Sequence, residues 1–197
     1  MAKSNSIKNI NQLTNKQVAV AIGPSALRTI RVSFERIKRE MLSDFNSHPV
    51  TREIEGGPRS TNISGTLGGK GNLFSFIGFE SGTKPVDTIR RLINRSYVRL
   101  APPIAGMTYF EFFLPDIEEV YTNTPMPWAS GRSWAKGIET GMSGLGQYAY
   151  SKKTIEDSRS GTAVQSENNL RTANYKPVQY MSAIIEKARN KIGNLVL

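Results

Sequence analysis

A glycine-rich segment at residues 55–71 is the first place in the sequence that suggests chemistry, because backbone N–H groups of such loops bind phosphates. Lys70 follows Gly69 there, as in a P-loop, but the next residue must be serine or threonine and is Gly71. A dinucleotide fingerprint would need a further glycine where the chain has Phe74. We therefore predict no nucleotide site and interpret the segment as a mobile or intersubunit loop.

A hydrolytic site is also not predicted. Residues 131–135, Gly-Arg-Ser-Trp-Ala, are similar to a degenerate nucleophile elbow, but that arrangement needs a histidine downstream of the serine. The single histidine, His48, lies upstream, and we interpret it as a boundary or surface residue. The carboxylates are too scattered to form a recognisable pair, and Asp116, Glu118 and Glu119 are interpreted as a solvated turn. A hydrolase or transferase with an unrecognised site stays open, but no catalytic residue, cofactor or metal ligand is predicted.

Residues suited to binding are clearer than residues suited to catalysis. Trp128, Arg132 and Trp134 lie in a segment rich in proline and glycine. Aromatic and basic residues in alternation are typical of single-strand binding, and tryptophan and arginine are also enriched at protein interfaces. Internal packing of the tryptophans is the third alternative. We favour a subunit or partner interface, with these candidate residues: Gly68, Gly69, Lys70, Trp128, Arg132, Trp134, Lys152 and Lys153.

Composition limits the class of protein. The chain has 197 residues, 38% of them hydrophobic, and a net charge of +10 whose excess lies in the first 60 residues and after residue 121. This balance permits contact with nucleic acid or with an acidic protein. No cysteine is present, so disulfides and thiolate metal sites are excluded. No secretory signal and no apolar run of about 18 residues is found, so we expect a protein without membrane contact, made in the cytoplasm.

Three helices are predicted to position these residues. Apolar side chains recur at helical spacing from Pro24 to about Phe45, with charged residues on the opposite, solvated face. A central amphipathic helix over 86–93 has Pro85 near its first turn, and a C-terminal helix starts at Pro177. The stripe of the first helix consists of Leu27, Ile30, Phe34, Ile37, Met41 and Phe45.

Strands are predicted from apolar and aromatic runs. The pattern predicts a buried strand at Leu73–Phe79 and two further strands at Tyr97–Leu100 and Met107–Leu114. Both faces of the last are largely apolar, so we expect it to be central or covered. A further strand is expected near residues 145–150, and residues 17–22 suggest a short strand or a helical turn.

Together these elements predict an α+β fold. A small antiparallel sheet would be packed by a long N-terminal helix, a central helix and a C-terminal helix. We expect a flexible N-terminal arm at 1–16 and a single domain at 17–197. Long protruding loops are expected at about 55–71 and 120–150.

The order of features resembles the neck or tail-completion proteins of tailed bacteriophages. The long helix ends in His-Pro-Val-Thr at 48–51, and a glycine-rich loop leads into the apolar run. Phe-Glu-Ser-Gly-Thr at 79–83 then precedes a helix started by a proline, and Tyr-Lys-Pro-Val at 175–178 precedes the last helix. The resemblance covers most of the chain as an order of elements, and leaves open a head-proximal adaptor, a tail terminator or a tail-completion protein.

The resemblance implies a non-enzymatic virion protein. Members of this group are α+β protomers that assemble into a homo-oligomeric ring, a hexamer or dodecamer, around the DNA channel at the head–tail joint. Portal, adaptor or tail proteins would be its neighbours, and DNA would pass close by without specific binding. The alternative from the residues alone is a basic nucleic-acid-binding module that uses Trp128, Arg132 and Trp134.

Overall fold

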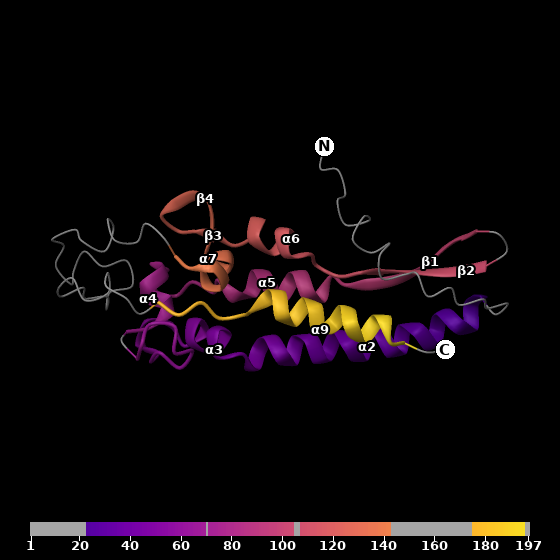
Figure 1. The fold of residues 1–197 in the computed structure, drawn as a ribbon, viewed down its shortest axis with the longest axis horizontal. Helices are drawn as coiled ribbons and strands as arrows, with labels where there is room; N and C mark the ends of the chain where they lie inside the picture. Colours follow the sequence, from indigo (N-terminus) through magenta and orange to yellow (C-terminus); the bar gives the residue numbers. More distant parts are fainter. Residues whose placement is uncertain (1–22, 70, 105–106, 143–174, 196–197) are drawn as a thin grey trace.

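The protein is an elongated α+β molecule (Figure 1). Helices and a small antiparallel sheet make up the structure, which confirms the predicted fold class. The arm expected at 1–16, the short element at 17–22 and the strand expected at 145–150 lie outside the described residues. The computed structural model describes residues 23–69, 71–104, 107–142 and 175–195.

The longest element is α2, Gly23–Ser47, the helix that the apolar spacing predicts for residues 24–45. Its predicted stripe faces the core, where Leu27 is half-buried and the other five members are buried. The opposite face carries charged side chains in water. One stripe of side chains therefore determines how the rest of the chain packs on this helix.

A second helix, α3 (Pro49–Glu55), starts directly after α2. Pro49 ends α2, as predicted, because the residue before a proline disfavours the helical conformation. That residue, His48, is extended, and its Nδ1 atom accepts the N–H of Val50 at 3.2 Å. His48 is therefore the N-cap of α3, which confirms its interpretation as a boundary residue.

Residues 73–79 form a short helix, so the predicted buried strand is wrong. The helix α4, Leu73–Ile77, begins at Asn72, whose side chain accepts the N–H of Ser75 at 2.9 Å. It ends at Gly78, which has the left-handed φ of 84° that glycine adopts at helix ends. Periodicity cannot distinguish a short buried strand from a short buried helix, and here the two caps favour the helix.

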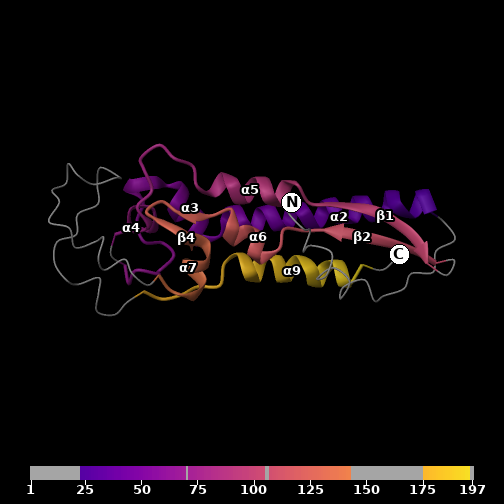
Figure 2. The ribbon, with the colours of Figure 1, turned by 90° about the horizontal axis from the view of Figure 1, so that it is seen from above.

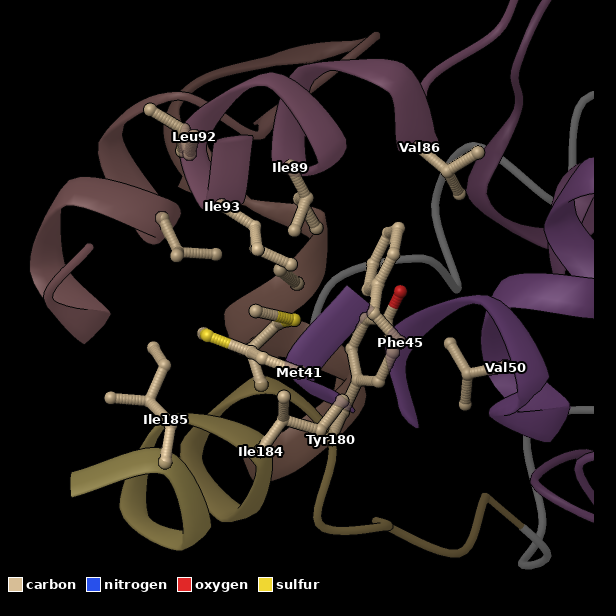
Figure 3. Packing of buried hydrophobic residues seen from close by; sticks show 14 of the residues in the cluster. Met41, Phe45, Val50, Val86, Ile89, Leu92, Ile93, Tyr180, Ile184 and Ile185 are labelled. Atoms are coloured by element: carbon tan, nitrogen blue, oxygen red, sulfur yellow. The ribbon is translucent and has the colours of Figure 1, made fainter. Parts of the chain in front are cut away.

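The central and C-terminal helices are confirmed as α5, Val86–Asn94, and α9, Met181–Gly193. They lie along two sides of α2 (Figure 2). Apolar side chains from the three helices meet in the core (Figure 3), among them Met41, Phe45, Ile89, Ile93, Ile184 and Ile185.

The helix α9 starts later than predicted because the residues before it make tertiary hydrogen bonds. Lys176 donates its N–H to the Thr66 carbonyl at 2.8 Å, and Val178 donates its N–H to the Ile138 carbonyl at 3.2 Å. The backbone from Pro177 to Tyr180 accordingly has no regular structure, and α9 begins at Met181.

The sheet is an antiparallel ribbon of β1, Tyr97–Ile104, and β2, Met107–Phe113, as predicted. Its inner face packs on α2, where Phe112 contacts Phe34 with ring centroids 5.7 Å apart. Of the two predicted alternatives, central or covered, the first is wrong because β2 pairs only with β1 in the described residues, whereas α2 does cover one face of the strand. Its aromatic residues on both faces are explained by α2 on one side and, on the other, by the stack of the half-buried Phe113 on the exposed Tyr97.

The segment predicted as a long loop at 120–150 contains short elements as far as residue 142. After the helix α6 come the strands β3 and β4, which form a small hairpin, and then the helix α7. Their bounds are Ile117–Thr122, Pro125–Met126, Ala129–Ser133 and Trp134–Thr140. The loop prediction is therefore wrong for this part, because prolines and glycines here separate elements instead of preventing them.

The acidic residues before this hairpin start a helix and do not form the predicted turn. Asp116 is the N-cap of α6, and its Oδ1 atom accepts the N–H of Glu118 at 2.6 Å and of Glu119 at 3.2 Å. Their carboxylates also lie at the positive end of the helix dipole. Aspartate followed by two glutamates is a helix start signal.

Candidate functional site

The glycine-rich loop closes around a buried carboxylate. Glu53 of α3 is fully buried, and its Oε1 atom accepts the N–H of Leu73 at 2.7 Å and the side-chain N–H of Asn62 at 2.9 Å. Its Oε2 atom accepts the N–H of Ser64 at 2.8 Å. Within the described part of the chain, no lysine or arginine forms a salt bridge with it. Three hydrogen bonds therefore take the place of an opposite charge.

Asn62 organises the turn of the same loop. Its Oδ1 atom accepts the N–H groups of Leu67 at 2.9 Å and Gly69 at 3.1 Å. Thr66 and Leu67 are buried, and Pro58, in the middle of the short 3₁₀ helix η1 (Gly57–Arg59), accepts a hydrogen bond from Asn72 at 3.0 Å. Polar side chains and two buried residues therefore fix this loop to α3 and α4.

This geometry explains why the loop does not look like a phosphate site. The backbone N–H groups of Ser64 and Leu73 point at a carboxylate of the same chain. Those of Leu67 and Gly69 point at an amide oxygen. Donors that would receive a phosphate in a P-loop are thus already bonded, in agreement with the rejection of a nucleotide site from the sequence.

The two tryptophans of the candidate interface contact the inside of the molecule. Trp134 is 2% exposed and meets the edge of Phe79, with ring centroids 5.7 Å apart. Trp128 is half-buried, and its indole N–H donates to the Ile77 carbonyl at 2.7 Å. Trp128 also lies against Gly78, where a Cβ atom would come within 3.3 Å of its ring. Of the three alternatives, these contacts favour internal packing.

The other candidate residues do not form one cluster. Gly68 and Gly69 are exposed on the glycine-rich loop, both with positive φ, and Arg132 is exposed on β4. Lys70, Lys152 and Lys153 lie outside the described residues. The chain positions that suggested a shared interface therefore divide between the core, two separate surfaces and undescribed segments.

An aromatic surface that sequence analysis did not single out lies on the outer face of the β1–β2 ribbon. Tyr97 and Phe113 stack there with ring centroids 4.4 Å apart, and Tyr97 is 48% exposed. Arg99 lies over the Phe113 ring at 4.9 Å and donates to Glu111 at 2.6 Å. We call these four residues the ribbon face. The sequence could have identified this face, because successive side chains of a strand point to opposite sides. The odd-numbered residues of the predicted strand at 107–114 therefore lie on one side of the ribbon.

A second exposed surface lies along α2. Arg28, Arg31, Arg36 and Arg39 project from the side opposite the core, with Val32 among them at 66% exposure. We call these five residues the arginine face. Beside it an open groove of about 690 Å³ lies where α2 meets α3, lined by Arg39, Leu42, Ser43, Asn46, Ser47 and Arg52.

The histidine and two tyrosines have pKa values displaced mainly by burial. Burial lowers the pKa of His48, opposed by a hydrogen bond to the Gln179 backbone and by Glu139. Burial raises the pKa of Tyr180, whose hydroxyl lies 2.7 Å from Thr51 Oγ1. Burial also raises the pKa of Tyr121, which donates to Glu139. These groups stabilise contacts between helices, and each shift has a structural cause.

The described residues contain no group of three or more histidine and acidic side chains that could hold a metal ion. None of the described helices is both long and apolar enough to cross a membrane. Comparisons with protein-family models, with curated proteins and with solved structures found no match for this chain.

Proposed function

We propose that this chain is a structural virion protein of the phage head–tail joint, a neck or tail-completion connector that forms a homo-oligomeric ring around the DNA channel. The observation that carries the proposal is the ribbon face. It carries two stacked aromatic rings, of which Tyr97 is exposed and Phe113 half-buried, and the exposed Arg99, residue types that are enriched at protein interfaces.

The arrangement of elements supports the same proposal. The resemblance implies helices packed on a small antiparallel sheet, and here α2 packs on the β1–β2 ribbon while α5 and α9 pack on α2 (Figures 1 and 2). An elongated protomer offers long sides on which copies meet. Portal, adaptor or tail proteins would contact the ends of such a ring, and the virion would be its location.

The alternative, a basic nucleic-acid-binding module, has less support. It needs exposed aromatic rings on which bases stack, and it relied on Trp128 and Trp134. Trp134 packs in the core, and the indole of Trp128 is bonded to Ile77. The net charge of +10 alone fits an acidic protein partner equally well.

The experiment is to purify virions and identify this chain in them by mass spectrometry, with its copy number. We expect a fixed copy number that is a multiple of six. The number is counted in assembled particles because such rings need not form from the isolated protein. A chain absent from purified virions contradicts the proposal, and so does steep, salt-dependent DNA binding that Trp128→Ala abolishes.

A further inference from the structure

The arginines of the arginine face of α2 have no salt-bridge partner among the described residues. The acidic side chains of this helix already have cationic partners: Glu35 pairs with Lys38, Glu40 with Lys191 and Asp44 with Lys187. In contrast, Arg28, Arg31, Arg36 and Arg39 form no salt bridge with any of the described residues. Glu35 lies four residues from Arg31 and from Arg39, but it is one carboxylate, already paired with Lys38, among four arginines. The arginines therefore repel each other more than Glu35 attracts them, and an acidic partner would stabilise them.

The residue types on this face favour a protein partner over nucleic acid. All four cations are arginines, and arginine is enriched at protein interfaces while lysine is depleted. Val32 is the most exposed large apolar side chain in the described residues and lies among them. A phosphate backbone would pair with the arginines but would leave Val32 without an apolar contact. The adjoining groove adds Leu42 and Arg52, which continue the same chemistry.

The same chain carries a matching acidic surface. Glu118 and Glu119 are exposed and adjacent on α6, and neither forms a salt bridge within the described ranges. Figure 1 shows α6 on the opposite side of the molecule from α2, and Figure 2 shows α6 over α2 when seen from above. A basic surface and an acidic surface thus lie on opposite sides of one protomer.

We propose that the arginine face of one copy binds the Glu118–Glu119 surface of the next copy. Because two different surfaces meet, the contact is heterologous, and it repeats head to tail until the rotation closes a ring. This inference rests on the proposed function, which requires a ring, and adds which sides of the protomer meet. Opposite charges across the contact also set the direction of assembly.

Cysteine cross-linking tests the contact directly, since the chain has no cysteine of its own. Val32→Cys and Thr122→Cys place thiols beside the two surfaces, both at exposed positions. The double variant, treated with a short bismaleimide in its oligomeric state, is expected to give a ladder of dimers, trimers and larger species. The control, Val32→Cys with Ile63→Cys, uses another exposed side chain, on the glycine-rich loop, and is expected to give no ladder.

Charge reversal provides a second test with its own rescue. Arg36→Glu/Arg39→Glu makes the α2 surface acidic, and Glu118→Arg/Glu119→Arg makes the α6 surface basic. Each double variant alone is expected to lose at least ten-fold in association, and a mixture of the two is expected to assemble again. Rescue in the mixture shows that both variants fold. The control Arg59→Glu/Lys84→Glu matches the charge change of Arg36→Glu/Arg39→Glu at exposed positions elsewhere and is expected to assemble normally.

The outcomes separate this inference from the proposed function. If the chain forms rings but Val32→Cys/Thr122→Cys gives no ladder, or if the charge-reversed variants assemble like the unmodified protein, the contact proposed here is wrong and the ring stands. Dimers from Val32→Cys alone would show that α2 meets α2, which also overturns it. If the chain forms no oligomer in solution or in particles, both proposals are wrong.

Discussion

The Glu53 carboxylate accepts the backbone N–H of Leu73 at 2.7 Å, which joins α3 to the first residue of α4 across 20 residues of chain. The glycine-rich loop between them closes around the same carboxylate through Ser64 and Asn62. A segment that composition alone suggests is open therefore has a buried polar centre. The loop is held in one conformation, in which the exposed Gly68 and Gly69 are presented at a defined place.

Replacing Glu53 should destabilise the protein much more than replacing a neighbour. In Glu53→Ala the buried N–H of Leu73 and the partly buried N–H of Ser64 lose their acceptor, at a cost of roughly 2–4 kcal/mol. The control, Glu55→Ala, removes a half-exposed pair with Arg90 and should cost about 0–1 kcal/mol. Urea unfolding measures both. Equal losses in the two variants would show that the loop does not depend on this carboxylate.

Much of this fold follows from the sequence, and the exceptions have physical reasons. The helices α2, α5 and α9 were predictable because each repeats apolar residues over several turns. The helix α4 was not, because its five residues, four of them apolar, are too few to show a period, and its caps, Asn72 and Gly78, are recognised only once a helix is assumed. The burial of Trp134 was also hidden, because it depends on contact with Phe79, which is distant in the chain.

Two glycines with the same backbone conformation should differ in their tolerance of alanine. Gly78 has a φ of 84° and Gly82 a φ of 85°, so alanine at either should cost about 1–2 kcal/mol from the left-handed conformation. Only at Gly78 does the new Cβ atom come within 3.3 Å of Trp128, whose bond to Ile77 limits its movement. Gly78→Ala should therefore cost more and shift the tryptophan fluorescence. Equal melting temperatures for the two variants would contradict this packing.

Stability should depend on pH through His48. Its folded pKa lies below the ordinary value of about 6.5, so the unfolded chain binds the proton first as pH falls. The stabilising contribution is therefore complete above about pH 6.5 and is lost as pH falls through the folded pKa. NMR titration of this single histidine gives the folded pKa directly. A value at or above the ordinary one would contradict the prediction.

The variant His48→Asn supplies the control for this titration. Asparagine can also accept the N–H of Val50 as an N-cap, but it does not ionise in this range. Its stability at about pH 8 should be within roughly 1 kcal/mol of the unmodified protein. Its pH dependence between about 5 and 7 should be flatter, since carboxylates alone then contribute. An unchanged slope would assign the pH dependence to other groups.

Removing the aromatic pair of the ribbon face should affect assembly more than folding. Tyr97→Ala/Phe113→Ala deletes a stack on an exposed face, which costs the protomer on the order of 1–2 kcal/mol. The proposed function predicts that the variant stays folded but no longer enters particles. Circular dichroism and recovery in virions measure the two effects. The control, Ile63→Ala, removes an exposed apolar side chain elsewhere and should be incorporated normally. Normal incorporation of the double variant would exclude the ribbon face from the assembly.

The most direct measurement of the central claim is an image of purified particles by electron cryo-microscopy, with this chain labelled and located. The account predicts a closed ring of copies around the channel at the joint between head and tail, with the ribbon face of each protomer against a neighbour. A labelled chain that is found elsewhere in the particle, or that is missing from it, would contradict the account.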